Sequence, residues 1–151
     1  MSAHRHIVPP RADEGHLKVT ETELRHWGEE LGRSITPPLL VTLTGELGVG
    51  KTTLAQSICL GYGVRDEVTS PTYALVQEYS APRSAVFHID LFRVDSPDQL
   101  TNLGWDEIIA FRALVLVEWP ERAGPRLPEA HLPIDLDYVA GDPARRILLA
   151  G

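Results

Sequence analysis

The segment GELGVGKT, residues 45–52, carries the clearest chemical signal, because it fits the pattern G-x-x-x-x-G-K-[ST] at every fixed position. Its glycines allow successive N–H groups to turn toward one point, where a helix beginning at Lys51 would also direct its positive end. The Lys51 ammonium can reach β- and γ-phosphates, and the Thr52 hydroxyl can ligate Mg²⁺. We therefore predict an ATP site formed by Gly45, Glu46, Leu47, Gly48, Val49, Gly50, Lys51, Thr52 and Thr53.

An acidic residue at the end of a neighbouring strand should complete such a site, because P-loop enzymes usually hold Mg²⁺ through a carboxylate there. Glu118 follows the apolar stretch 113–117. An unpaired charge buried within a strand would cost too much, so we expect Glu118 at the carboxyl edge of a sheet. There it would be a metal ligand, with a capped strand end that holds no metal as the alternative. Asp90 is the competing carboxylate. Strand alternation places it on one face with His88, where the two could share a site; pairing of Asp90 with Arg93 or a backbone amide is the structural alternative.

A third candidate is Thr69-Ser70-Pro71-Thr72, about 20 residues beyond the loop, where many P-loop hydrolases have a switch that senses the γ-phosphate. Hydroxyl groups in this segment could contact Mg²⁺ or the attacking water. The same residues also make a good turn. Residue chemistry alone leaves both interpretations open.

The composition indicates one ordinary globular domain. The 151 residues are 43% hydrophobic and 23% charged, and 14 Lys and Arg against 21 Asp and Glu give a net charge of −7. Such a surface repels nucleic acid and anionic membranes, so we expect no direct sequence-specific nucleic-acid binding and no membrane contact. The single cysteine, Cys59, excludes an internal disulfide and a zinc cluster built on thiolates. No long apolar run or secretory signal is recognisable, which predicts a cytoplasmic protein.

The elements that must position these residues alternate along the chain. We expect a flexible N-terminal arm over residues 1–15 and a single domain over residues 16–151. Thr20 and Glu23 have the spacing of a capping box, and they predict a helix that Gly32 ends. Further strands are expected at 39–45, 74–79, 84–94, 113–119, 131–139 and 144–150, and further helices at 51–60, from 95 to 102 with an interruption at 102–104, and at 105–111.

Taken in order, five segments resemble the TsaE family, also called YjeE: small P-loop ATPases that take part in threonylcarbamoyladenosine modification of tRNA. The likeness covers about residues 17–150, and it implies an α/β fold: a P-loop NTPase-like three-layer sandwich with a mixed central sheet and an antiparallel C-terminal hairpin. Phe92 replaces a tyrosine common in the family, and Arg122 stands where a lysine is frequent. The five segments are GELGVGKTT (45–53), TSPTYALVQEY (69–79), FHIDLFRV (87–94), NLGWDEI (102–108) and VEWPERAGPRLP (117–128).

The resemblance implies an ATPase that serves a complex of TsaD and TsaB, the enzyme that transfers a threonylcarbamoyl group to the adenosine following the anticodon. By analogy, Thr52 and Glu118 would ligate Mg²⁺, and Asp90 would orient or deprotonate the attacking water. Thr72 would act in the switch, and Trp119 would lie against the nucleotide base or its surroundings, with core packing as the alternative. The resemblance thus predicts catalytic roles for Lys51, Thr72 and Asp90.

Two other functions compete with this one. A small-molecule kinase would transfer the γ-phosphate to a substrate hydroxyl, but about 30 residues after Glu118 leave little room for an acceptor pocket and an arginine-rich lid. A non-hydrolysing switch would work only through contacts of residues 69–79 that ATP orders. No internal arginine finger is obvious, and Arg93 is the nearest candidate. We therefore expect slow turnover by the isolated protein.

Overall fold

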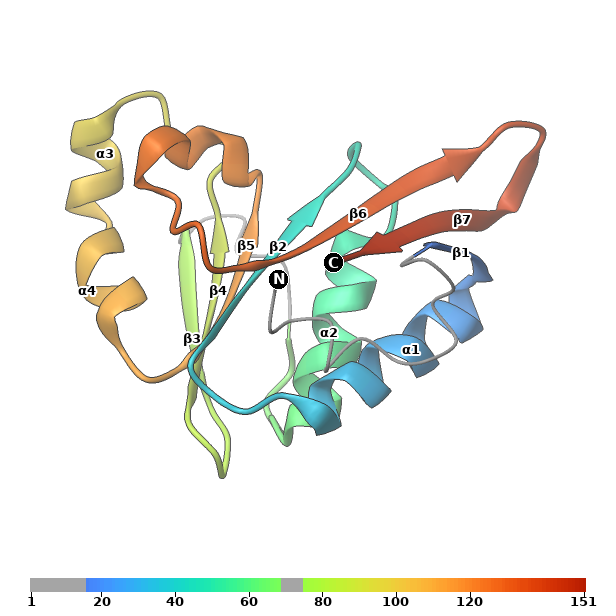
Figure 1. The fold of residues 1–151 in the computed structure, drawn as a ribbon, viewed down its shortest axis with the longest axis horizontal. Coiled ribbons are helices and arrows are strands. Elements are labelled where there is room, and N and C mark those ends of the chain that lie inside the picture. Colours follow the sequence, from blue (N-terminus) through green and yellow to red (C-terminus); the bar gives the residue numbers. More distant parts are fainter. Residues whose placement is uncertain (1–15, 69–74) are drawn as a thin grey trace.

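A mixed seven-stranded sheet forms the centre of the computed structural model, which describes residues 16–68 and 75–151 (Figure 1). The strand order is β1-β7-β6-β2-β5-β4-β3. The central strands β6, β2, β5 and β4 are parallel neighbours, whereas β1–β7, β7–β6 and β4–β3 are antiparallel pairs. The strands are β1 (His16–Thr20), β2 (Leu39–Thr44), β3 (Val76–Ser80), β4 (Ala85–Asp90), β5 (Leu114–Glu118), β6 (Leu132–Val139) and β7 (Asp142–Ala150).

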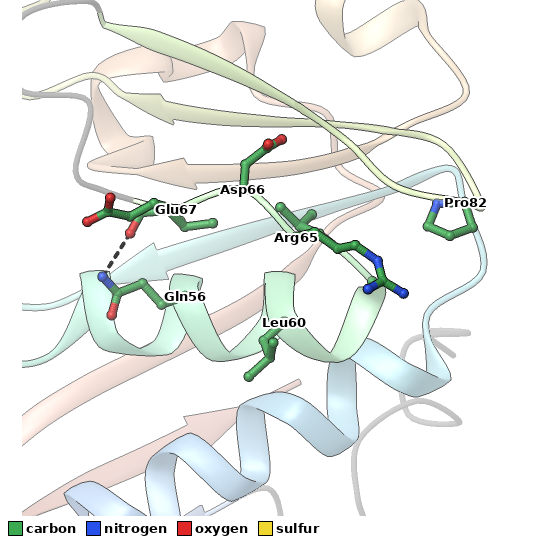
Figure 2. A pocket seen from close by; sticks show the side chains of 9 residues that line it. Gln56, Leu60, Arg65, Asp66, Glu67 and Pro82 are labelled. Carbon is green, nitrogen blue, oxygen red and sulfur yellow. Dashed lines mark hydrogen bonds between the residues drawn. The ribbon is translucent and has the colours of Figure 1, made fainter.

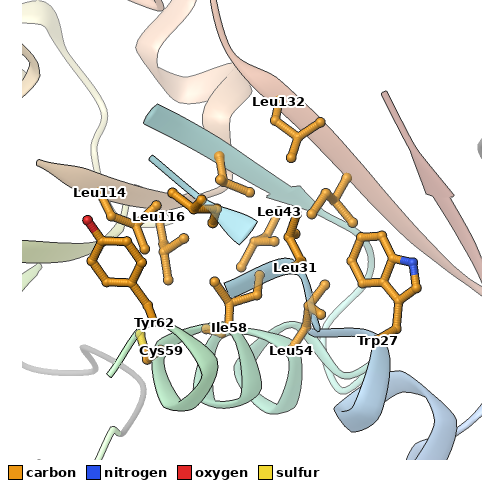
Figure 3. Packing of buried hydrophobic residues seen from close by; sticks show 14 of the residues in the cluster. Trp27, Leu31, Leu43, Leu54, Ile58, Cys59, Tyr62, Leu114, Leu116 and Leu132 are labelled. Carbon is orange, nitrogen blue, oxygen red and sulfur yellow. The ribbon is translucent and has the colours of Figure 1, made fainter. Parts of the chain in front are cut away.

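Helices cover both faces of this sheet, and each face has its own hydrophobic cluster. On one face lie α1 (Glu21–Ser34) and α2 (Lys51–Tyr62), packed on the cluster that Figure 3 shows from close by. On the other lie α3 (Pro97–Asn102), α4 (Trp105–Ala110) and the 3₁₀ segment η3 (Pro120–Arg126). These three layers, with the antiparallel β6–β7 pair, confirm the predicted fold class.

The central strands owe their position to continuous apolar sequence. Every residue of β5 is buried; Leu114 and Leu116 belong to the cluster under α1 and α2, while Val115 and Val117 belong to the opposite one. A strand covered on both faces needs such a run. Because β2, β5 and β4 are parallel, their carboxyl ends meet at one edge of the sheet. The glycine-rich loop, Glu118 and Asp90 all lie at that edge.

Glycines allow α1 and α2 to pack closely. The capping box of Thr20 and Glu23 begins α1 as predicted, but the helix continues past Gly32 to Ser34, so the predicted end at Gly32 is wrong. Gly32 lies against the backbone of α2: a β-carbon there would be 2.1 Å from the Ile58 carbonyl oxygen. A β-carbon at Gly61 of α2 would likewise be 2.1 Å from the Glu29 carbonyl oxygen. These glycines therefore serve close helix contact.

The two larger differences from the prediction concern strands. The strand expected at residues 84–94 ends at Asp90, because the Asp90 carboxylate accepts a hydrogen bond from the Phe92 N–H at 2.9 Å and turns the chain. β1 is absent from the prediction, although Leu17 and Val19 alternate with polar residues as strand residues do. The predicted arm, residues 1–15, lies outside the described residues. Within the described ranges, no helix combines the length and apolar character that crossing a membrane requires.

The helix contact gives a test. Gly32→Ala should lower the free energy of unfolding by about 1 to 3 kcal/mol, because the methyl group has no room against the α2 backbone. Helix propensity alone would produce a gain of up to about 1 kcal/mol. Urea unfolding measures the difference, with the exposed neighbour Arg33→Ala as control. An unchanged or raised stability of Gly32→Ala would show that the helices are not in such close contact.

Candidate functional site

The loop between β2 and α2 has a backbone suited to binding an anion. Gly50 precedes the helix with φ 119° and ψ 17°, in the left-handed region that side chains disfavour, and α2 begins at Lys51 as predicted. Gly45 lies close to β6: a β-carbon there would be 2.6 Å from the Leu136 carbonyl oxygen. Residues 46–48 are exposed, so the loop surface faces solvent at the N-terminus of α2.

Lys51 extends across this loop. Its Nζ atom donates a hydrogen bond to the Gly45 carbonyl at 2.6 Å and lies 4.0 Å from the centre of the Trp119 ring. The side chain is 5% exposed. Burial lowers the pKa of Lys51, and the charges of Glu118 and Asp90 act in the opposite direction. The two carboxylates at the sheet edge therefore favour the charged form of Lys51.

Glu118 is held by a partner on the neighbouring strand. It is 4% exposed, and the Nε2 atom of the fully buried His88 lies 2.7 Å from its Oε2 atom. Because an ionised carboxylate can only accept, the imidazole N–H is the donor in this pair. The Nδ1 atom of His88 has no hydrogen-bond partner among the described residues. His88 thus pairs with Glu118, and not with Asp90 as the strand alternation suggested.

Asp90 lies opposite Glu118 in the register of β4 and β5. Burial raises the pKa of the Asp90 carboxyl group, and the Glu118 charge raises it further, whereas the hydrogen bond from Phe92 N–H lowers it. The backbone-amide alternative is therefore the one observed, and Arg93 is exposed. A carboxylate with a raised pKa accepts a proton more readily, which suits the task of activating a water.

Trp119 lies at the lysine end of the loop. Besides contacting Lys51, its ring packs on Phe92 with 4.9 Å between ring centres, and the side chain also borders the cluster under α3 and α4. Its φ of 57° is the one positive value at a non-glycine residue in the described chain. Such a backbone conformation is unfavourable and is often found at functional sites. The structure thus brings the indole to the Lys51 ammonium, and its predicted contact with a nucleotide stays a prediction.

Cavities lie on both sides of the loop. One of about 250 Å³ is bordered by Lys51 and Trp119 together with two acidic residues, Glu121 and Asp137, that the sequence did not suggest. The other, of about 440 Å³, lies between the loop, the start of α1 and the β6–β7 hairpin. Its lining residues are Glu21, Leu24, Gly48, Val49, Gly50, Thr53, Pro143, Ala144 and Arg146.

A larger hollow of about 720 Å³ lies beside α2, further along that helix than Lys51 (Figure 2). There Gln56 donates a hydrogen bond from Nε2 to the Val68 carbonyl at 2.8 Å. Val68 is buried and directly precedes the segment 69–74. The predicted switch residues, Thr72 among them, lie outside the described residues, so their role stays a prediction.

The donor set at the sheet edge fits one kind of metal ion. Among the residues that the structure describes, no group of three or more His, Cys, Asp or Glu could hold a metal by itself. Mg²⁺ is bound differently, through one or two protein oxygens, substrate phosphates and water. Thr52, in the first turn of α2, and the buried Glu118 carboxylate offer oxygens of the required type. Both residues fit a site that a nucleotide would complete.

Comparison with known proteins gives consistent similarities. The sequence model of the family described as threonylcarbamoyl adenosine biosynthesis protein TsaE matches residues 19–147. The tRNA threonylcarbamoyladenosine biosynthesis protein TsaE of Haemophilus influenzae is 39% identical over 111 residues, 74% of this chain and 69% of that protein. The protein of the same name from Treponema pallidum is 34% identical over 124 residues, 82% of this chain and 90% of its own. The crystal structure of Bacillus subtilis YdiB has a TM-score of 0.73 at 27% identity, covering 90% of this chain and 85% of that one.

The buried His88–Glu118 pair gives a prediction about stability. His88→Leu should cost about 3 kcal/mol of unfolding free energy, because it leaves a buried carboxylate without its hydrogen-bond donor. His88→Gln, which keeps an N–H group, should cost less. The double variant His88→Leu with Glu118→Leu should recover much of the loss, since no charge then stays unpaired. Urea unfolding of these three variants and of the single variant Glu118→Leu completes the cycle and measures the coupling; additive effects of the two leucine substitutions would contradict the pair.

Proposed function

Because this chain belongs to the TsaE family of threonylcarbamoyl adenosine biosynthesis proteins, we propose that it is a Mg²⁺-dependent ATPase. In this proposal it acts with the TsaD–TsaB complex in threonylcarbamoyladenosine modification of tRNA. The observation that carries the ATPase is the position of Lys51. It begins a helix, its ammonium bonds across a glycine-rich loop to Gly45, and the charges of two carboxylates favour its charged form. A polyphosphate with its metal ion needs this combination of charges.

The nucleotide would lie across the loop. Its terminal phosphates would meet Lys51 and the loop N–H groups, and its nucleoside would enter the cavity of about 440 Å³ on the other side. Two buried apolar side chains, Leu24 and Val49, border that cavity, and the planar guanidinium of Arg146 lies at its wall. Apolar walls with a few polar groups are typical of sites for a nucleoside.

Hydrolysis would depend mainly on alignment and charge compensation. Thr52 and Glu118 would hold Mg²⁺, which when bound neutralises phosphate charge. Lys51 would stabilise negative charge that develops as the γ-phosphate leaves. Asp90, with its raised pKa, would orient the attacking water and accept its proton. Thr72 would sense the γ-phosphate from the segment that follows Val68.

The remaining chain fits the rival kinase less well. After Glu118 the chain forms η3 and then enters the sheet as β6 and β7. The described residues beyond Glu118 thus contain no helical lid that could close over an acceptor substrate. A nucleotide-dependent switch without hydrolysis would use the same phosphate loop. Phosphate release from ATP without an added acceptor distinguishes the hydrolase from both rivals.

Two substitutions test the ATPase. Lys51→Ala should weaken ATP binding at least 10-fold, because the phosphates lose their only buried ammonium partner among the described residues. Asp90→Asn should leave the ATP dissociation constant within about 3-fold but lower phosphate release about 10²- to 10⁴-fold. Calorimetry and a phosphate-release assay measure the two quantities, with the exposed Arg112→Ala at the opposite end of β5 as control. Strong loss of binding in Asp90→Asn would move Asp90 into the metal shell.

The partner proposal has a separate test. Phosphate release by the isolated protein should be slow and should rise by at least 10-fold when TsaD and TsaB are added together. The reason is that the sequence offers no obvious arginine finger, and Arg93, the nearest candidate, is exposed. Equal rates with and without the two proteins would contradict the coupling and leave the ATPase itself intact.

A further inference from the structure

The β6–β7 hairpin makes two hydrogen bonds to the phosphate loop, the loop of residues 45–50 between β2 and α2. No local sequence pattern predicts these bonds. The Tyr138 hydroxyl donates to the Leu47 carbonyl at 3.0 Å, and Nε of Arg146 donates to the Val49 carbonyl at 3.0 Å. The donors are 91 and 97 residues from their acceptors in the sequence. In Figure 1 the hairpin extends as a long ribbon that passes the end of β2, where this loop begins.

The two donors form one unit. Tyr138 and Arg146 lie directly opposite each other in the register of β6 and β7, and the guanidinium carbon lies 4.5 Å from the centre of the tyrosine ring. Nη1 of Arg146 also donates to the carbonyls of Pro143 and Arg145, at 2.9 Å each. The guanidinium is therefore fixed by its own hairpin before it contacts the loop.

Each of these bonds sets the direction of an N–H group. In a trans peptide unit the C=O and the next N–H point in opposite directions. A Leu47 carbonyl held outward by Tyr138 therefore turns the Gly48 N–H to the other side of the loop, and a Val49 carbonyl held by Arg146 does the same for Gly50. Neither glycine has a side chain that could fix its peptide unit by packing. Leu47 is 77% exposed, whereas Val49 is buried and restrains the second unit from one side. The hairpin supplies the restraint that the first unit lacks and adds to that of the second.

We propose that Tyr138 and Arg146 are positioning residues that hold the phosphate loop in its anion-binding conformation. This rests on the proposed function in one respect: the anion is the polyphosphate of a nucleotide. It assigns to the C-terminal hairpin a role in the affinity of a loop that lies more than 90 residues earlier. The loop binds a polyphosphate tightly because its donors are aligned before the ligand arrives.

Arg146 also borders the cavity of about 440 Å³, so a direct contact to the nucleoside must be separated from positioning. Inorganic triphosphate makes this separation, because it has the phosphates of ATP and no nucleoside. A loss of triphosphate binding reports on the loop. A loss confined to ADP reports on the nucleoside side.

The experiment measures binding of ADP and of inorganic triphosphate by calorimetry to Tyr138→Phe, Arg146→Gln and the double variant. Phenylalanine keeps the ring beside Arg146 and removes only the hydroxyl. Each single variant should weaken both ligands by about 3- to 10-fold, as expected for one lost hydrogen bond, and the double variant should weaken them further. In the free protein, the amide resonances of Gly48 and Gly50 should shift in the same variants, a change that a general loss of stability would not confine to the loop.

One matched control comes from the hairpin and one from α2. Arg145→Gln changes the neighbouring arginine, which pairs with Asp142. Tyr62 lies at the far end of α2 from the loop, and Tyr62→Phe removes a hydroxyl that hydrogen-bonds to Ser84. Neither should alter ligand binding or the two glycine resonances. Urea unfolding confirms that every variant is folded at the temperature of the assay.

Three results would overturn the inference. Unchanged triphosphate binding in both single variants would show that the loop keeps its shape without the hairpin. A loss for ADP alone in Arg146→Gln would make Arg146 a nucleoside contact instead. Binding of neither ligand by the unmodified protein would remove the nucleotide site itself, and with it the proposed function, which the first two results leave intact.

Discussion

The arrangement around the site depends on one buried carboxylate. Glu118 ends a strand that is apolar on both faces, and a charge in that place must have partners. Its partner from the adjacent strand is His88, and its charge also favours the charged form of Lys51 in α2. The buried charge of Glu118 therefore constrains the register of β4 and β5 as well as the position of α2. A slip of one residue in that register would turn His88 to the other face of the sheet. The electrostatics of the site and the pairing of the sheet are therefore one constraint.

Local signals in the sequence were sufficient for much of this structure. The capping box at Thr20, the helix start at Lys51 and the strand that leads to Glu118 were all predicted, because each depends on residues within one or two turns of chain. The three-layer α/β class was implied by the resemblance of five segments to one family, and the sheet and its helices confirm it.

Contacts between distant segments could not be predicted in this way. A glycine such as Gly32 is typical of a helix end, and only the position of the α2 backbone shows that it allows α1 and α2 to pack closely. Alternation places His88 on one face with Asp90, but its hydrogen-bond partner is Glu118 on the neighbouring strand. Nothing in the residues around Tyr138 or Arg146 indicates the loop that both contact. The sequence motifs thus reveal where the site is, but they do not include the distant residues that contact its loop and its carboxylate.

The place of β7 in the sheet bears on how the protein is made. β1, the first described strand, has β7 as its neighbour at the sheet edge, and β7 follows every other strand in the chain. During translation β1 must therefore wait, with an open edge, until β7 has left the ribosome. Since Arg146 is carried by β7, the phosphate loop gains its hairpin support at the same late moment. A nascent chain would thus complete its sheet and its proposed nucleotide pocket in a single closing step.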